Sequence, residues 1–260
     1  MAPEAIIHFQ GPMDNLEGYD RSLPAGEQPV HIPVSFLHAM DVREAVFVNE
    51  QGVPLDMEAD SDDARSCHFV AFDVPSSKDP SKLHAVGTVR LVPFPHEPHP
   101  LPGSAWDIPE EIEPLTSDPP RYIIDRATSL HDGKEAYIKL GRWAVVKDFR
   151  GRGIAKKLVE RAVQWLEDNP AYFNAAVPGV DPSQTHWKGL LCVHAQKHVA
   201  KGWEGCGFQL DEKMGEWTEA GIPHVGMFRR IDVSKAATAK TLNLVPGDAA
   251  TDSEAPRYNH

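Results

Sequence analysis

The spacing of hydrophobic side chains along the chain predicts a mixed α/β domain. Between residues 34 and 48 the apolar positions recur every three or four residues, as they do on the buried face of a helix. Residues 67–74 and 85–93 instead alternate between apolar and polar side chains, which is typical of strands with one buried face. A helix therefore precedes a β-rich middle segment.

The second half of the chain continues this pattern. A strong apolar strand is predicted at 136–146, and the helix after it carries Ile154, Leu158, Ala162 and Leu166 on one face. A short buried strand is then expected at 190–194, followed by a helix at 196–205 that ends at a glycine. Two further strands, around Phe208 and at 224–231, are expected to form a hairpin.

Two stretches rich in proline and glycine interrupt these elements, at about 94–120 and 169–188. Because such sequences favour turns over regular structure, we expect both to be insertions, with no strand in the first. The predicted organisation has three parts. These are an N-terminal extension at 1–29, one domain at 30–232 that carries both insertions, and a flexible polar tail at 233–260.

The net charge of −12 is distributed unevenly along the 260 residues. Residues 1–65 hold 13 acidic and 3 basic side chains, whereas residues 138–165 hold 8 basic and 2 acidic ones. An acidic chain lacks the surplus cations that phosphate backbones attract, which argues against nucleic acid as a general partner. Two poles of opposite sign instead favour two separate binding tasks.

The cysteines and the termini narrow the expected setting. Cys67, Cys192 and Cys206 show neither the spacing of a zinc ribbon nor an even-numbered disulfide framework, so we expect no metal and a reducing compartment. The N-terminus lacks the pattern of a signal peptide, and no apolar run reaches the roughly 18 residues of a membrane span. The sequence thus predicts a cytoplasmic protein without a membrane partner.

The segment most informative about chemistry is 150–155, Arg-Gly-Arg-Gly-Ile-Ala, between the predicted strand and helix. Its glycines allow the backbone to approach a ligand closely, and the helix presents free N–H groups and the positive end of its dipole. These features predict a pyrophosphate cradle. The segment matches neither a Walker P-loop nor a dinucleotide fingerprint, whose third glycine is replaced by Lys156. A glycine turn flanked by solvated arginines is the alternative.

Arg150-x-x-Gly153-x-Ala155 after an apolar strand resembles the acyl-CoA-binding motif of the GNAT N-acyltransferase superfamily. Residues 192–196, Cys-Val-His-Ala-Gln, followed by Gly207-Phe208, are similar to a later strand, helix and turn of that fold. Three further segments resemble the opening helix, the acidic loop and the closing hairpin of its ElaA-like and YjcF-like branch, namely 43–51, 58–63 and 221–227.

The resemblance covers about residues 30–232 and implies the GNAT fold, an α/β arrangement whose central mixed, mostly antiparallel sheet is flanked by helices. It implies that parallel strands at 140–146 and 190–194 splay apart to admit the pantetheine arm of acetyl-CoA. Main-chain groups of the first strand are then expected to meet the pantetheine amides and the thioester oxygen. The implied acetyl-CoA-binding residues are Trp143, Ala144, Val145, Arg150, Gly151, Arg152, Gly153, Ile154, Ala155 and Lys156.

Acyl transfer to an amine needs a base, because an amine with a pKa near 10.4 is protonated at pH 7. We expect the acidic pole to attract the amine, with Glu50 and Asp63 as candidate bases acting directly or through water. A solvated acidic loop with helix-capping carboxylates is the alternative. The expected acceptor-binding residues are Arg43, Phe47, Glu58, Asp60 and Asp125.

One position departs from the family pattern. The family commonly places a tyrosine ahead of the Gly-Phe turn to protonate the leaving thiolate, and here Trp203 occupies that position. An indole N–H donates hydrogen bonds but is not a useful acid. His194 is therefore the expected acid, with His68 or a water as alternatives and a structural role for His194 left open.

The resemblance implies an enzyme that transfers an acetyl group from acetyl-CoA to a small primary amine, such as an amino sugar, a polyamine or an amino-acid-like compound. The acceptor could instead be a protein lysine or N-terminus. A non-catalytic acyl-CoA sensor is favoured by the missing tyrosine, and residues 43–63 also resemble acyl-homoserine-lactone synthases. The expected partners are the amine and coenzyme A, with a homodimer as a further option.

Overall fold

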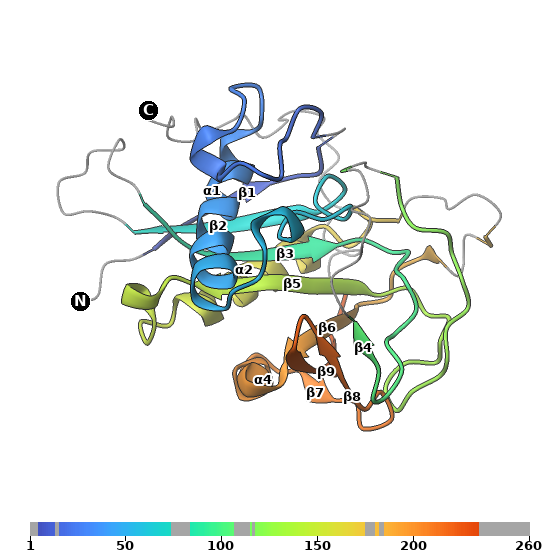
Figure 1. Cartoon of the computed structure of the whole chain (residues 1–260). Coiled ribbons are helices and arrows are strands. Elements are labelled where there is room, and N and C mark those ends of the chain that lie inside the picture. The colour runs from blue at the N-terminus through green and yellow to red at the C-terminus, as the bar shows by residue number, and fades with distance from the viewer. Residues whose placement is uncertain are drawn as a thin grey trace, which may run out of the picture.

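The strands of this protein pair into one mixed sheet in the order β1-β2-β3-β5-β6-β9-β8-β4, with β7 also pairing with β9 (Figure 1). The computed structural model describes residues 5–13, 16–73, 84–106, 115, 118–174, 180–181 and 185–233. Within these ranges the strands are β1 (Ile6–Gln10), β2 (Cys67–Asp73), β3 (His84–Val92), β4 (Ala105–Trp106), β5 (Ile138–Val145), β6 (Leu190–Gln196), β7 (Gln209–Leu210), β8 (Glu216–Glu219) and β9 (Ile222–Arg230).

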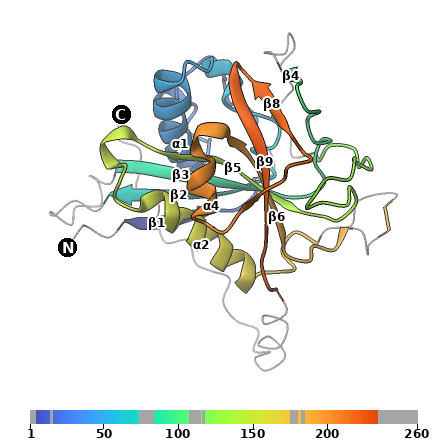
Figure 2. The same cartoon turned by 90° about the horizontal axis from the view of Figure 1, so that it is seen from below.

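Helices cover both faces of the sheet. α1 (Val34–Arg43) continues into the wider turns of η2 (Glu44–Glu50), and α2 (Ile154–Asp168) follows β5. Seen from below, α1 and α2 lie on opposite sides of β2, β3 and β5 (Figure 2). Short helical turns complete the chain at η1 (Ala25–Glu27), η3 (Leu55–Met57), η5 (Lys147–Phe149), η6 (Lys197–Val199) and α4 (Ala200–Glu204).

The side chains of β2 show how the two layers form. Phe69 and Ala71 join the core cluster that includes the apolar face of α2, whereas Val70 and Phe72 pack with Ala39 of α1 on the other face. Because successive side chains of a strand point to opposite faces, a strand covered on both sides is apolar throughout. β2 is buried along nearly its whole length for this reason.

Most of the predicted elements are confirmed. The helix at 34–48, the two strands of the middle segment, the apolar strand and its amphipathic helix, and the buried strand at 190–194 all form within a few residues of the expected bounds. The expected helix at 196–205 forms as η6 followed by the short α4. No helix of the described residues is long and apolar enough to cross a membrane.

Three short strands differ from the expectations. β4 lies inside 94–120, where no strand was predicted. It forms because two residues of this segment pair through their main chains with β8. β8 itself was missed, and it makes the hairpin with β9, while β7 also pairs with β9. β1 lies in the predicted extension at 1–29, yet it pairs with β2 as an edge strand of the sheet. The predicted tail lies outside the described residues beyond Val233.

Candidate functional site

The parallel strands β5 and β6 separate partway along their length. They pair only between Ile138–Leu140 and Leu191–Val193. β5 nevertheless continues to Val145 along β3, and β6 continues to Gln196 along β9. Main-chain N–H and C=O groups on the two facing edges are therefore left for another partner. This separation confirms the expected splay of the two strands.

A bulge interrupts β5 where the separation begins. Gly141 pairs with Arg90 and Ala144 pairs with Thr88, so two residues of β5 oppose one residue of β3. Arg142 is the first of these two and has a φ of 51°, in the left-handed region that residues other than glycine rarely adopt. A bulge turns the strand locally and changes the direction of its main-chain groups.

The loop after β5 is built for close approach by a ligand. Gly151 and Gly153 have φ values of 76° and 79°, which favours glycine at both positions. A Cβ atom added at either glycine would meet no heavy atom within 4 Å, so the loop is open in front of both. Gly153 is the N-cap of α2 and no side chain caps that helix, which leaves its first N–H groups available.

The side chains of the two loop arginines are fixed by hydrogen bonds to nearby carbonyl and carboxylate groups. Arg150 donates from Nε to the Val145 carbonyl at 2.8 Å, and its Nη2 lies 2.8 Å from both carboxylate oxygens of Glu50. Arg152 donates to the Asp148 carbonyl at 2.9 Å. Glu50 was predicted as a base at the acceptor, but the structure places its carboxylate against the loop guanidinium.

Trp143 and Trp203 join the loop to the later helix. The Trp143 indole N–H donates to the Ala155 carbonyl at 2.9 Å, and its ring packs 4.2 Å from that of Trp203. Trp203 is buried and also contacts Phe208 edge-on. The residue in the family's tyrosine position is therefore part of the core.

The other residues predicted to bind acetyl-CoA lie in β5 and α2 and divide between core and surface. Ala144, Val145 and Ile154 are buried, so they contribute main-chain groups and packing, not side chains, at this site. Lys156 is exposed, and its Nζ lies 3.7 Å from Glu160 in the next turn of α2.

Three carboxylates of the predicted acidic pole, those of Glu58, Asp60 and Asp63, are paired with arginines. Arg43 of α1 donates to Glu58 from Nε and to Asp63 from Nη1, both at 2.7 Å, and its Nη2 also contacts the Glu58 carbonyl. Two further arginines complete what we name the acid–arginine cluster: Arg90 binds Asp60 and Asp63, and Arg142 binds Glu58 and Asp60. Three carboxylates thus face three guanidinium groups.

These contacts are incompatible with the predicted roles of the cluster. Burial raises the pKa of Asp63, but the charges of Arg43 and Arg90 outweigh it and hold the pKa well below its usual value. At Asp60, burial likewise raises the pKa, but the charge of Arg90 outweighs it and lowers the pKa to about 2. Asp63 is completely buried and is a poor base, and the guanidiniums occupy the carboxylates that were expected to bind an amine.

Two contacts lie on the face of the sheet opposite α2. Phe47, predicted to bind the acceptor, packs there against a cluster that contains Ala144. The side-chain amides of Gln51 and Gln196 bind each other at 2.8 and 3.1 Å, which links η2 to the end of β6 across the separated strands.

Glu219 is the carboxylate that sequence reasoning missed on this face. Its Oε1 accepts a hydrogen bond from the Trp217 indole at 2.6 Å and lies 4.0 Å from His194 Nδ1. Its side chain is 38% exposed, so solvent reaches it. No signal marked Glu219 in the sequence, because the short strand β8 was not predicted. A signal did exist for Arg90, a charged residue inside a strand whose neighbours are buried.

His194 and Asp125 both lie beside His99, in arrangements that differ from their predicted roles. Burial lowers the pKa of His194 well below its usual value, and the charge of Lys139 lowers it further. The imidazole is therefore neutral at pH 7 and is a weak proton donor. Asp125 accepts hydrogen bonds from the backbone N–H groups of His99 and Arg126, at 2.7 and 2.6 Å, and so fixes the proline-rich segment above β6.

The sequence of this chain matches the model of a known protein family. The sequence model of the Acetyltransferase (GNAT) family matches residues 43–185, more than half of the chain. The chain belongs to the GNAT acetyltransferase family. The match includes the acid–arginine cluster, the bulged strand and the glycine loop, and ends before β6. As a GNAT acetyltransferase, the protein is an acyl-CoA-dependent transferase with the predicted α/β fold.

Solved structures with a similar arrangement are distant in sequence. A protein from Lactobacillus plantarum described as an N-acetyltransferase is 19% identical, with a TM-score of 0.47, over 87% of this chain and 97% of its own. An acyl-CoA N-acyltransferase from Pseudomonas aeruginosa is 18% identical, with a TM-score of 0.46, over 87% and 99%. Escherichia coli ElaA is 17% identical, with a TM-score of 0.45, over 86% and 100%.

Proposed function

We propose that this GNAT enzyme transfers an acetyl group from acetyl-CoA to a primary amine of a small molecule by direct attack within a ternary complex. The observation that carries the proposal is the separation of β5 and β6 directly beside an open glycine loop. One feature accepts an extended arm between main-chain edges, and the other accepts a pyrophosphate. Acetyl-CoA has both parts, in that order.

The loop supplies the anion site. Free N–H groups at the start of α2 and the open space before Gly151 and Gly153 fit a pyrophosphate, and Arg152 adds a cation beside them. Arg150 is paired with Glu50. Because this pair is partly exposed, exchange of the carboxylate for a phosphate has a small cost.

The bulged strand supplies groups for the thioester. As the amine attacks, negative charge develops on the thioester oxygen, and main-chain N–H groups already fixed in direction stabilise that charge without reorganising. The bulge at Arg142 aims the N–H groups of β5 away from the regular ladder. The acid–arginine cluster holds Arg142 in this conformation, which is its role in the proposal.

Glu219 is the base that we propose for the acceptor amine. At pH 7 the pH lies about 3.4 units below the pKa of a lysine-like amine, so the amine is protonated. Without a base, about 4.6 kcal/mol is needed to remove that proton and expose the lone pair. Glu219 is accessible, is oriented by Trp217, and lies on the face where β5 and β6 separate. A small acceptor is favoured because residues 94–106 lie over this face and leave the His194 side chain only 15% exposed.

The test measures coenzyme A release with a thiol-reactive dye, using acetyl-CoA and a panel of amino sugars, polyamines, amino acids and lysine-containing peptides. We expect turnover with a small amine, and a fall in kcat/KM of about 10²-fold or more in Glu219→Gln. Glu216→Gln is the matched control, because Glu216 lies on the same strand and, among the described residues, its side chain pairs with Lys197 at the surface.

Each other result assigns a different function. Faster turnover of peptides than of any small amine identifies a protein acetyltransferase. Binding of acetyl-CoA in calorimetry without turnover of any acceptor identifies a sensor. Equal activity of Glu219→Gln and Glu216→Gln removes Glu219 from the mechanism, whatever the acceptor.

A further inference from the structure

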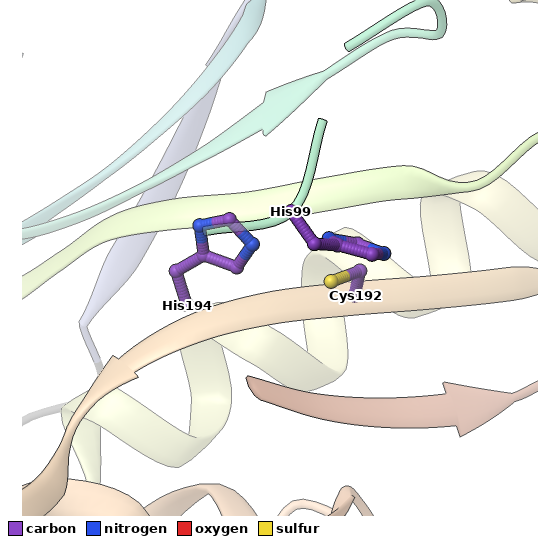
Figure 3. Close-up of side chains that lie close together, drawn as sticks. All are labelled: His99, Cys192 and His194. Atoms are coloured by element: carbon purple, nitrogen blue, oxygen red, sulfur yellow. The ribbon is translucent and has the colours of Figure 1, made fainter. Parts of the chain in front are cut away.

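Three potential metal ligands meet on the face of the sheet opposite α2. Cys192 and His194 rise from the same side of β6, and the side chain of His99 lies close to both (Figure 3). His99 belongs to residues 94–106, which we name the proline-rich strap. One ligand atom from each of these residues lies within 4.8 Å of the other two. Cys192 and His99 are buried, and His194 is nearly so.

Each histidine keeps one ring nitrogen without a hydrogen-bond partner among the described residues. These atoms are Nδ1 of His99 and Nε2 of His194, and both are buried. Buried polar atoms are nearly always paired in native proteins, so two unpaired nitrogens beside one buried thiol call for an explanation. A bound cation satisfies both nitrogens at once.

The hydrogen bonds around His99 fix the tautomer that a metal requires. His131 Nε2 lies 2.9 Å from the Glu135 carbonyl, which can only accept, so His131 carries its proton on Nε2. Its Nδ1 is then an acceptor, and His99 Nε2 donates to it at 3.2 Å. His99 Nδ1 is left with a free lone pair.

His194 has a similar arrangement. Its Nδ1 faces the Glu219 carboxylate at 4.0 Å, which favours the proton on Nδ1 and leaves the lone pair on Nε2. A carboxylate or carbonyl behind a ligating imidazole is the usual outer shell of a protein metal site. The Asp125 carboxylate lies 3.7 Å from His99 Nε2, so each histidine has a carboxylate near the ring nitrogen that faces away from the proposed ion.

The spacing of the three atoms fits a small cation. For atoms no more than 4.8 Å apart, a common point exists within about 2.8 Å of all three. Bonds to zinc are about 2.0–2.3 Å long for nitrogen and sulfur, so each ligand atom has to move by about 0.5–0.8 Å. Small changes in side-chain torsions cover that distance.

We propose that His99, Cys192 and His194 bind one divalent cation of borderline softness, with Zn²⁺ as the expected ion. A thiolate with two imidazoles is a donor set that zinc accepts, and three protein ligands leave a fourth position for water. Binding forms a metal–sulfur bond and breaks the S–H bond of Cys192, and one proton leaves to solvent. The ion ties the strap to β6, and Glu219 faces the other ring nitrogen of His194 and is not a ligand.

The experiment titrates the metal-free full chain with Co²⁺ and then displaces it with Zn²⁺. We expect one equivalent to give the near-ultraviolet band of thiolate-to-cobalt charge transfer and the visible bands of tetrahedral cobalt, both abolished by Zn²⁺. Cys192→Ser should lose the charge-transfer band, and His99→Ala and His194→Ala should each bind Zn²⁺ at least tenfold more weakly. Cys206→Ser and His96→Ala are the matched controls, since both residues lie outside the three-ligand set.

The wild-type measurement alone keeps the proposal falsifiable if a variant does not fold. Absence of a thiolate band in the wild-type protein overturns the site, as does unchanged Zn²⁺ affinity in a Cys192→Ser protein with native circular dichroism. A band that Cys206→Ser abolishes assigns the metal elsewhere and also overturns it. These outcomes do not depend on acetyl transfer, so they leave the proposed function to its own test.

Discussion

The left-handed backbone at Arg142 gives a prediction whose sign depends on the local conformation. At a φ of 51°, a residue with a Cβ atom carries strain of about 1–2 kcal/mol that glycine does not. Glycine also costs about 0.4–1 kcal/mol through the greater freedom of the unfolded chain. Arg142→Gly should therefore be more stable than Arg142→Ala by about 0.5–1 kcal/mol, although alanine is the usual choice for truncation.

The assay is differential scanning calorimetry of the two variants beside the wild-type protein. For a domain of this size, the difference corresponds to a Tm about 1–4 °C higher for Arg142→Gly than for Arg142→Ala. Both variants should melt below the wild-type protein, because Glu58 and Asp60 lose the guanidinium that binds them at 3.0 and 2.8 Å. The loss is modest, since Arg142 is 28% exposed.

Arg161 provides the matched control. It is exposed within α2, where helical backbone makes glycine less favourable than alanine by about 1 kcal/mol. Arg161→Gly should therefore melt below Arg161→Ala, the reverse of the order at Arg142. If Arg142→Ala is as stable as Arg142→Gly, or more stable, the backbone there is not left-handed and the bulge argument fails.

Three further predictions concern buried and paired charges. Glu50→Gln frees the loop guanidinium, so calorimetry should show unchanged or tighter coenzyme A binding with kcat retained; a kcat loss near 10²-fold would instead restore Glu50 as a base. Arg43→Met leaves buried carboxylates without their main partner and should lower the free energy of unfolding in urea by about 3–5 kcal/mol, unlike Arg161→Met at the surface. Because the pKa values of Asp60 and Asp63 are depressed in the fold, their contribution to stability should be full above about pH 5 and fade as the pH falls towards 2; a Tm that stays constant over this range contradicts the pairing.

The roles predicted for the carboxylates of residues 1–65 show why the charge balance along a sequence is a poor guide to the site. The balance between acidic and basic residues within 1–65 predicted free carboxylates, but Arg90 and Arg142 come from strands outside that segment. Net charge along a sequence does not reveal which charges meet in the fold. The buried carboxylates need guanidinium partners: Arg43 lies within the acidic segment, and the sheet brings two more from β3 and β5.

The sequence by itself determined the features that depend on neighbouring residues. The order of the longer helices and strands from α1 to β6, the glycine loop at 150–155 and the open start of α2 follow from local spacing, turn chemistry and helix termini. Only the tertiary structure decided which distant side chains meet. Glu219 reaches His194 through a two-strand hairpin, and His99 reaches Cys192 only because the strap folds across β6. Such contacts join segments whose separation along the chain carries no periodic signal, so only the packing of the sheet and strap reveals them.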